Sequence, residues 1–165
     1  MEFLKADLED ADEEVESIEE RLLEYEEKDG IFLPKEKIMK KMKKILSRCL
    51  HSINITTPTI MDLEKLDLFE ISSSVSVKAA CEIDISNVHH QEVLDDLESF
   101  DNISIRIYSD RDRFCAIRDG EELLLAAAGE QPDQLLVFRT TDPKQIKIFT
   151  PLIMESWVKG KKIKT

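Results

Sequence analysis

Glycine and long apolar runs are scarce in this sequence. With 4 glycines among 165 residues, little material exists for a loop that cradles phosphates, and neither G-x-x-x-x-G-K-[ST] nor G-x-G-x-x-G occurs. The absence of G-x-S-x-G excludes a serine hydrolase built on that motif. No stretch reaches about 18 consecutive apolar residues, so no membrane span is predicted. The N-terminus is acidic, unlike that of a signal peptide, and we expect a cytoplasmic protein without a membrane partner.

Cysteine and histidine are also few. The three cysteines, Cys49, Cys81 and Cys115, are odd in number and scattered, which argues against a disulfide framework and for a reducing compartment. Redox or metal sensing by a cysteine stays open as an alternative, although Cys115 falls inside a predicted strand and is expected to be an inert core residue. Zinc sites usually present ligand pairs at short spacing, and no cysteine pair does so here. We therefore expect no metal and no cofactor.

The net charge of −12 is concentrated at the N-terminus. Residues 1–30 hold 14 Asp and Glu against 3 Lys and Arg, whereas the rest of the chain holds 21 against 20. The overall acidity therefore says little about what the nearly neutral remainder binds.

Residues 1–30 also carry a heptad pattern. Their apolar side chains are spaced alternately by four and three residues, as at the a and d positions of a coiled coil. We predict an N-terminal coiled-coil helix that forms a homodimer, with an amphipathic helix packed on its own chain as the alternative. The expected dimer interface consists of Leu4, Leu8, Ala11, Val15, Ile18, Leu22 and Tyr25.

Residues 31–51 contain a second predicted helix that is basic and amphipathic. One face carries apolar residues, and lysine fills most of the remaining positions. Such a basic stripe can contact nucleic acid phosphates, but no aromatic residues are interleaved with it. We favour a solvated face, paired in part with the acidic leader of the same or a neighbouring chain.

Residues 52–165 alternate between strand and helix periods. The pattern predicts strands at 52–57, 75–83 and 103–109, with helices at 59–72 and 87–100 between them. A hairpin follows around Asp119–Gly120, a pair that tolerates the positive φ of a tight turn, and one more strand precedes a closing helix at 142–160. Asp142 is the expected N-cap of that helix, and Pro151 is expected to kink or restart it. We predict an α/β fold with a mixed, mainly parallel sheet flanked by helices.

The order of these elements resembles a known family. The strand ending in "ITTP", the strand "SVSVKAACEID", the helix and strand "EVLDDLESFDNISIRIY", the hairpin "FCAIRDGEELLLAA" and the stretch "LLVFRTTDPKQI" follow one another as in the effector domain of archaeal TrmB-like transcriptional regulators. That domain is a phospholipase D-like α/β unit. The likeness covers about residues 31–165, with the heptads where the family has its dimerising helix.

The resemblance implies a ligand-sensing and dimerisation domain rather than an enzyme. The H-x-K-x-x-x-x-D motif of catalytic phospholipase D proteins, which supplies the histidine nucleophile, is absent. The family's winged helix-turn-helix is also missing, so we expect either an excised effector fragment or a freestanding relative, with DNA bound only through a head outside this chain. The alternative function is a freestanding coiled-coil interaction module with a passive α/β scaffold.

An unknown small-molecule effector is expected at the carboxyl ends of the parallel strands, where open α/β sheets bind ligands. His89 and His90 begin a helix close in sequence to Cys81, which permits metal or acid–base chemistry, but a helix N-terminus lined with polar residues is the favoured interpretation. The candidate ligand-binding residues are Thr56, Thr57, Glu82, Asp84, Asn87, His89 and His90.

Overall fold

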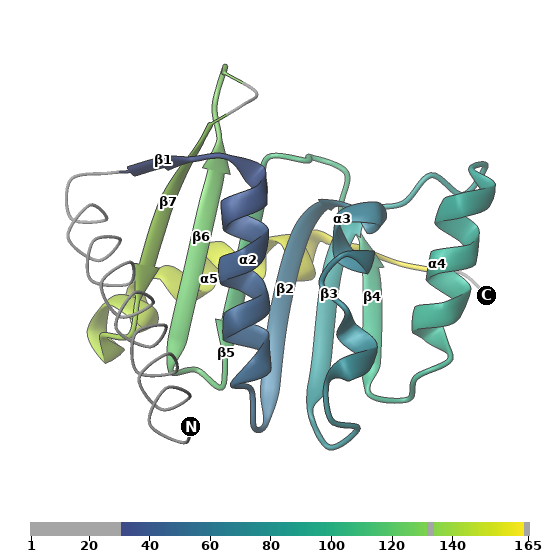
Figure 1. Ribbon diagram of the computed structural model, residues 1–165, viewed down its shortest axis with the longest axis horizontal. Helices are drawn as coiled ribbons and strands as arrows, with labels where there is room; N and C mark the ends of the chain where they lie inside the picture. Colours follow the sequence, from purple (N-terminus) through teal and green to yellow (C-terminus); the bar gives the residue numbers. More distant parts are fainter. Residues whose placement is uncertain (1–30, 132–133, 164–165) are drawn as a thin grey trace, which may run out of the picture. The chain divides into compact units, whose positions relative to one another are not determined.

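The computed structural model describes residues 31–131 and 134–163 (Figure 1). The chain divides into two units, Met1–Ile31 and Phe32–Thr165. The predicted coiled coil and its dimer interface lie outside the described residues and stay predictions.

The described residues form an α/β fold around a mixed sheet of eight strands. Across the sheet the strands are β1 (Ile31–Leu33), β7 (Leu135–Thr140), β6 (Glu122–Ala128), β5 (Arg113–Arg118), β2 (Ser52–Thr59), β3 (Ser76–Glu82), β4 (Ile103–Ile107) and β8 (Lys161–Lys162).

Most neighbouring strands are antiparallel, so the prediction of a mainly parallel sheet is wrong. Only β2–β3 and β3–β4 run parallel among the described strand pairs with a defined register. The pairs β2–β5, β5–β6, β6–β7 and β4–β8 are antiparallel. After β4 no further crossover helix intervenes before β7, and strands joined by short hairpin turns must run in opposite directions.

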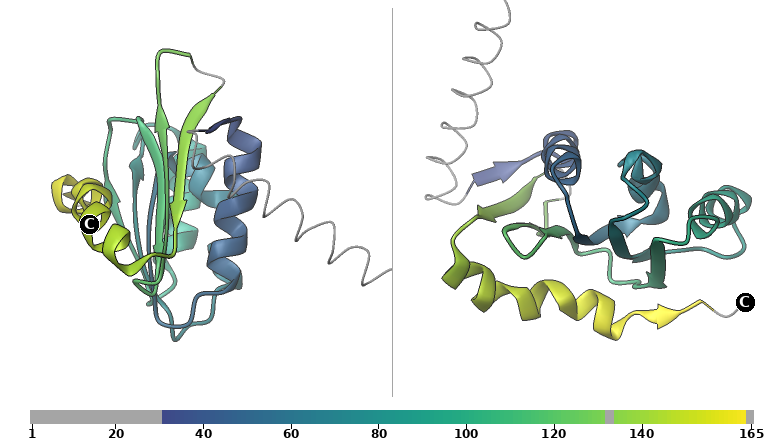
Figure 2. Two further views of the ribbon diagram at one scale, coloured as in Figure 1. Left: turned by 90° about the vertical axis from the view of Figure 1, so that its left-hand side faces the viewer. Right: turned by 90° about the horizontal axis from the view of Figure 1, so that it is seen from below.

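Helices cover both faces of the sheet (Figure 2). On one face lie α2 (Lys35–Ser47), α3 (Ile60–Glu64), the short 3-10 helix η1 (Leu68–Glu70) and α4 (Val88–Glu98), and on the other lies α5 (Pro143–Lys159). No helix in the described ranges is long and apolar enough to cross a membrane.

The helix predicted over 59–72 is interrupted. Helix α3 ends at Glu64, and Asp67 adopts the left-handed conformation (φ 55°) immediately before η1. This conformation is uncommon for a residue with a Cβ atom, so the apolar periodicity of the segment does not extend into one continuous helix.

The closing helix begins as predicted but is not restarted at Pro151. The Asp142 side chain accepts hydrogen bonds from the backbone N–H groups of Lys144 and Gln145, and Pro143 occupies the first turn. Pro151 lies inside one continuous helix. Proline removes one backbone donor from the helix, and the Thr150 hydroxyl donates to the Ile146 carbonyl in the turn before it.

The core has a layer on each side of the sheet. Helix α2 buries Ile38, Met42 and Ile45 against the sheet, as its amphipathic pattern predicts. On the opposite side, Ile146 and Ile153 of α5 pack with apolar residues of β5 and β6, namely Cys115, Ile117 and Leu123.

The predicted hairpin turn is confirmed. Asp119 and Gly120 have φ values of 53° and 67°, the positive values of a tight hairpin turn, and the Glu121 backbone N–H donates to the Arg118 carbonyl at 2.8 Å. The alanine-rich strand after it is β6, paired on both sides within the sheet.

Candidate functional site

The two threonines predicted to bind a ligand lie at the end of β2 and are buried. Thr56 is 3% and Thr57 is 1% exposed. The Thr56 hydroxyl shares a hydrogen bond with the hydroxyl of Ser156 on α5, and the Thr57 hydroxyl donates to the Thr59 carbonyl over 2.8 Å. Thr56 therefore joins β2 to α5, whereas the Thr57 bond stays within the end of β2.

Glu82, at the end of β3, forms an ion pair with the β4–β5 connection. Its carboxylate lies 2.7 Å from Nε of Arg111. Arg111 has a φ of 50°, which is uncommon for a non-glycine residue. The Glu82 carboxylate is thus engaged by a residue that the sequence analysis did not select.

Four of the predicted residues meet at the start of α4. The Asn87 side-chain oxygen accepts from the backbone N–H groups of His89 (2.9 Å) and His90 (3.3 Å), as an N-cap. The Nδ1 atom of His90 accepts from the Asp84 backbone N–H at 3.0 Å. The Asp84 carboxylate accepts from the Ser86 hydroxyl and backbone N–H, and these bonds lower its pKa. This arrangement is a capped loop.

The adjacent histidines do not act together. The His89 side chain is 80% exposed and its Nδ1 lies 3.9 Å from the Glu92 carboxylate, whereas His90 is tied to the loop before the helix. No group of three or more His, Cys, Asp or Glu that could hold a metal ion occurs within the described ranges.

A polar cluster that sequence reasoning missed lies where β5 begins. Arg113 donates to the Asp112 carboxylate (2.9 Å) and to the Leu152 carbonyl of α5 (3.2 Å), and lies 3.5 Å from Glu155. Hydrogen bonding to Asp112 raises the pKa of Arg113, and the same contact lowers the pKa of Asp112. The signal that could have found it is the run of alternating Asp and Arg at 110–113 between two strands.

Tyr108 completes this cluster at the end of β4. Arg113 lies over its ring, 5.6 Å from the centroid. Its hydroxyl is buried and makes no hydrogen bond of good geometry within the described residues. Burial first, and then the nearby Asp110, raise the pKa of Tyr108 to about 12, so this phenol stays protonated at neutral pH. Because β5 is antiparallel to β2, its first residues lie beside the last residues of β2, β3 and β4. The cluster is therefore at the same end of the strands as Glu82.

The buried carboxylate of Glu122, at the turn end of the β5–β6 hairpin, is surrounded by arginines. Glu122 is 1% exposed, and its carboxylate is bound by Arg139 and lies 3.2 Å from Arg118 and 3.5 Å from Arg48. Burial by itself would raise the pKa of Glu122, but hydrogen bonding and attraction to Arg139 and the other arginines outweigh it and lower that pKa. These contacts join α2, β5, β6 and β7, which is a structural role.

The three cysteines are unpaired, and all are poor nucleophiles. Burial raises the pKa of Cys81 to about 12 and that of Cys115 to about 11. For Cys49, partial burial and the charge of Asp119 raise the pKa to about 11. The thiolate is the reactive form, so the structure gives these thiols no activation.

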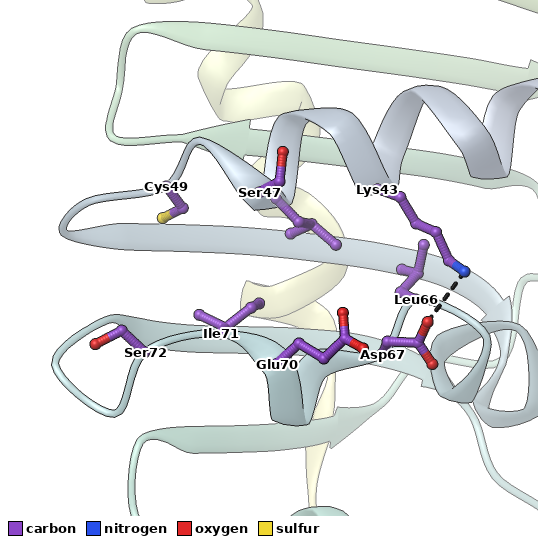
Figure 3. A pocket seen from close by; sticks show the side chains of 9 residues that line it. Lys43, Ser47, Cys49, Leu66, Asp67, Glu70, Ile71 and Ser72 are labelled. Atoms are coloured by element: carbon purple, nitrogen blue, oxygen red, sulfur yellow. Dashed lines mark ion pairs between the residues drawn. The ribbon is translucent and has the colours of Figure 1, made fainter. Parts of the chain in front are cut away.

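One hollow on the face covered by α2 and η1 has the size of a small ligand. Its volume is about 330 Å³, at the lower end of the range for ligand pockets. It is not formed by the predicted ligand-binding residues but by the second half of α2 and the segment around η1. Its lining residues are Lys43, Leu46, Ser47, Cys49, Leu66, Asp67, Glu70, Ile71 and Ser72 (Figure 3).

Comparison with known proteins places the fold. No protein-family model matches the sequence, and no curated protein matches it in a sequence search. Among solved structures, the archaeal chromatin protein TrmBL2, described as having a novel mode of DNA binding, is similar with a TM-score of 0.56 and 18% identity. That match covers 98% of this chain and 69% of TrmBL2.

Two further solved structures share the fold as well. NucT from Helicobacter pylori is similar with a TM-score of 0.57 and 12% identity, over 81% of this chain and 97% of NucT. Nuc from Salmonella typhimurium, a phospholipase D family member, is similar with a TM-score of 0.53 and 16% identity, over 75% of this chain and 89% of Nuc. At these identities the likeness establishes the fold alone: this chain has the phospholipase D-like α/β fold that these proteins share.

Proposed function

We propose that this chain is the ligand-sensing and dimerisation part of a transcriptional regulator and that it has no catalytic activity. One observation carries the proposal: the fold matches TrmBL2 over 98% of the chain, while the sequence lacks the H-x-K-x-x-x-x-D motif. None of His51, His89 and His90 is followed by lysine two positions later.

The described side chains support the non-catalytic part. A covalent nucleophile needs an adjacent base or a lowered pKa, yet the pKa of each of the three thiols is raised. His90 accepts a backbone hydrogen bond, and His89 projects from the first turn of α4 with a side chain that is 80% exposed.

In this proposal an effector shifts the equilibrium between two arrangements of a homodimer. A ligand moves such an equilibrium only by binding the two states with different affinity. Dimerisation would use the heptad residues of 1–30, and DNA would be bound by a head that these 165 residues do not contain. Helix α2 is the first helix after the heptads, so it is the element through which the α/β unit would act on them.

Dimerisation is tested by sedimentation equilibrium of the full chain. We expect a dimer, and we expect the double substitution Leu8→Asp and Val15→Asp to give a folded monomer, because two charges in an a/d seam destroy its apolar packing. Glu9→Gln with Glu16→Gln is the matched control and should stay dimeric. A wild-type monomer, or a dimer unaffected by the Asp substitutions, contradicts the proposal.

The regulatory part is tested by fusing the full chain to a DNA-binding head that represses a reporter only as a dimer. The fusion should repress, and the Leu8→Asp, Val15→Asp variant should not.

Catalysis is tested with a chromogenic phosphodiester. Hydrolysis by the wild type that disappears in His90→Ala would overturn the non-catalytic assignment.

A further inference from the structure

The groove between α2 and η1 combines an apolar floor with a charged rim. Leu46 and Leu66 are buried at its base, 4% and 3% exposed, and Ile71 lies beside them. Figure 3 shows Lys43 reaching from α2 toward Asp67, with the Glu70 carboxylate on the same side as Asp67. A ligand in this groove would therefore contact hydrocarbon below and charge at one end.

The charges of the rim are not balanced. The Lys43 ammonium lies 3.0 Å from the Asp67 carboxylate, which leaves the second carboxylate, that of Glu70, without an ion pair among the described residues. Two carboxylates against one ammonium give the lining a net charge of −1. A monovalent cation restores neutrality, whereas an anion would add to the excess negative charge of the lining.

The backbone holds both carboxylates at the groove. Asp67 occupies the left-handed region, at φ 55°, where a residue with a Cβ atom stores strain. Its carbonyl accepts from the Glu70 backbone N–H at 3.0 Å, which forms the turn of η1. This turn carries Asp67 and Glu70 on one short segment facing the C-terminal half of α2.

We propose that this groove binds a small organic cation, an ammonium group on a short apolar chain, with the ammonium at Glu70, beside the Lys43–Asp67 ion pair, and the chain on Leu46, Leu66 and Ile71. The inference deepens the proposed sensing function and rests on it. A ligand here would bridge α2 to the α3–η1 segment, and in sequence only the short strand β1 separates α2 from the residues that carry the heptads. Binding would thereby favour one position of α2.

The test is a titration of the ¹⁵N-labelled full chain with n-butylammonium, followed by amide chemical shifts. We expect saturable shifts centred on Asp67, Glu70 and Ile71. Glu70→Gln keeps the size of the side chain and removes its charge. It should raise the dissociation constant about five-fold, the effect of losing one partly exposed charge pair. Glu98→Gln removes the same charge from an exposed position on α4 and should leave the constant unchanged.

n-Butanol and butyrate, which carry an apolar chain of similar length without the cation, should not saturate the site. The proposal is overturned if butyrate or butanol binds as well as the amine, if Glu98→Gln weakens binding as much as Glu70→Gln, or if no amide of the groove shifts saturably. The dimerisation and reporter experiments use no amine, so a failure here is distinguishable from a failure of the proposed function.

Discussion

The Oδ1 atom of Asp119, at the tip of the β5–β6 hairpin, accepts a hydrogen bond of 2.7 Å from the backbone N–H of His51. The same carboxylate accepts from the N–H groups of Leu50 and Ser52, both at 2.9 Å. One side chain therefore satisfies three successive backbone donors in the connection between α2 and β2. Burial alone would raise the pKa of Asp119, but the bonds from Ser52, Leu50 and His51 outweigh it and hold that pKa well below its usual range.

Replacement of Asp119 by asparagine should lower the free energy of unfolding by ~2 kcal/mol, because hydrogen bonds to a charged group are stronger than those to a neutral one. Asparagine tolerates the left-handed backbone of this position, so the substitution tests the charge rather than the turn. Urea denaturation at pH 7 measures the change. Asp101→Asn, at an exposed position, is the control and should be within about 0.5 kcal/mol of the wild type.

The difference between the wild type and Asp119→Asn should depend on pH in one direction. A carboxylate whose pKa is lower in the folded state stabilises the protein above its unfolded pKa of about 3.9. That stabilisation is lost as the pH falls toward the folded value. The two unfolding free energies should therefore differ by a constant amount between pH 7 and about 5, and the difference should shrink as the pH falls below about 4. A difference that grows on acidification would contradict this assignment of the carboxylate.

The arginines around Glu122 should contribute unequally. The Arg118 side chain is 14% exposed, whereas that of Arg48 is 47% exposed. Arg118→Met should cost about 3 kcal/mol, because it removes a partner from a buried carboxylate. Arg48→Met should cost less than about 1 kcal/mol, as for other exposed ion pairs. Thermal and urea unfolding of both variants provide the comparison, and equal losses would show that exposure does not set the strength of these pairs.

The cysteines should resist alkylation in the native protein. At pH 8 a thiol with a pKa of about 11 is thiolate in only about one molecule in a thousand, so iodoacetamide should react at least about 100-fold more slowly than with free cysteine. Cys49 is partly exposed and should be labelled first, with Cys81 and Cys115 labelled only after unfolding. Mass spectrometry of timed samples identifies the sites. Rapid native labelling of Cys81 would instead support a redox role.

Local signals in the sequence identified many of the elements because short-range chemistry decides them. The Asp119–Gly120 turn and the Asp142 cap depend on the residues themselves and their immediate neighbours. The direction of strand pairing, by contrast, does not depend on local residues alone. Whether β5 returns beside β2 or beside β4 is decided by packing across the whole sheet, so the mainly parallel sheet was an error of topology. The break at Asp67 was missed because the apolar spacing of 59–72 continues across it.

The candidate site was harder to predict for the same reason. Polar residues near strand ends could be selected from the sequence. The sequence does not show which of them are engaged in hydrogen bonds that hold the fold together, as Thr56 is with Ser156 and Asn87 is as the N-cap of α4. The groove combines two segments, α2 and η1, that are about 20 residues apart and whose approach only the folded chain defines. Its carboxylate Glu70 follows no recognisable motif.

Gly160 permits a close approach between the end of α5 and β4. A Cβ atom at this position would lie 2.9 Å from both the Arg106 Cβ and the Ser156 carbonyl oxygen. The same junction holds Trp157, whose carbonyl accepts from Arg106 at 2.8 Å and whose ring centroid lies 4.1 Å from the Arg106 guanidinium. Any shift of the backbone at Gly160 would therefore disturb the stacking of the guanidinium on the indole.

Gly160→Ala should destabilise the protein by about 1–2 kcal/mol through this overlap. Because Trp157 is the single tryptophan of the chain, its emission reports on the junction directly, and we expect its maximum or intensity to change as the cation–π contact loosens. Gly129→Ala is the matched control, since a Cβ atom there meets nothing within 4 Å, and it should leave both stability and emission unchanged. Unaltered emission in Gly160→Ala would mean that the end of α5 adjusts without moving Trp157 away from Arg106, and that the glycine is not required for their contact.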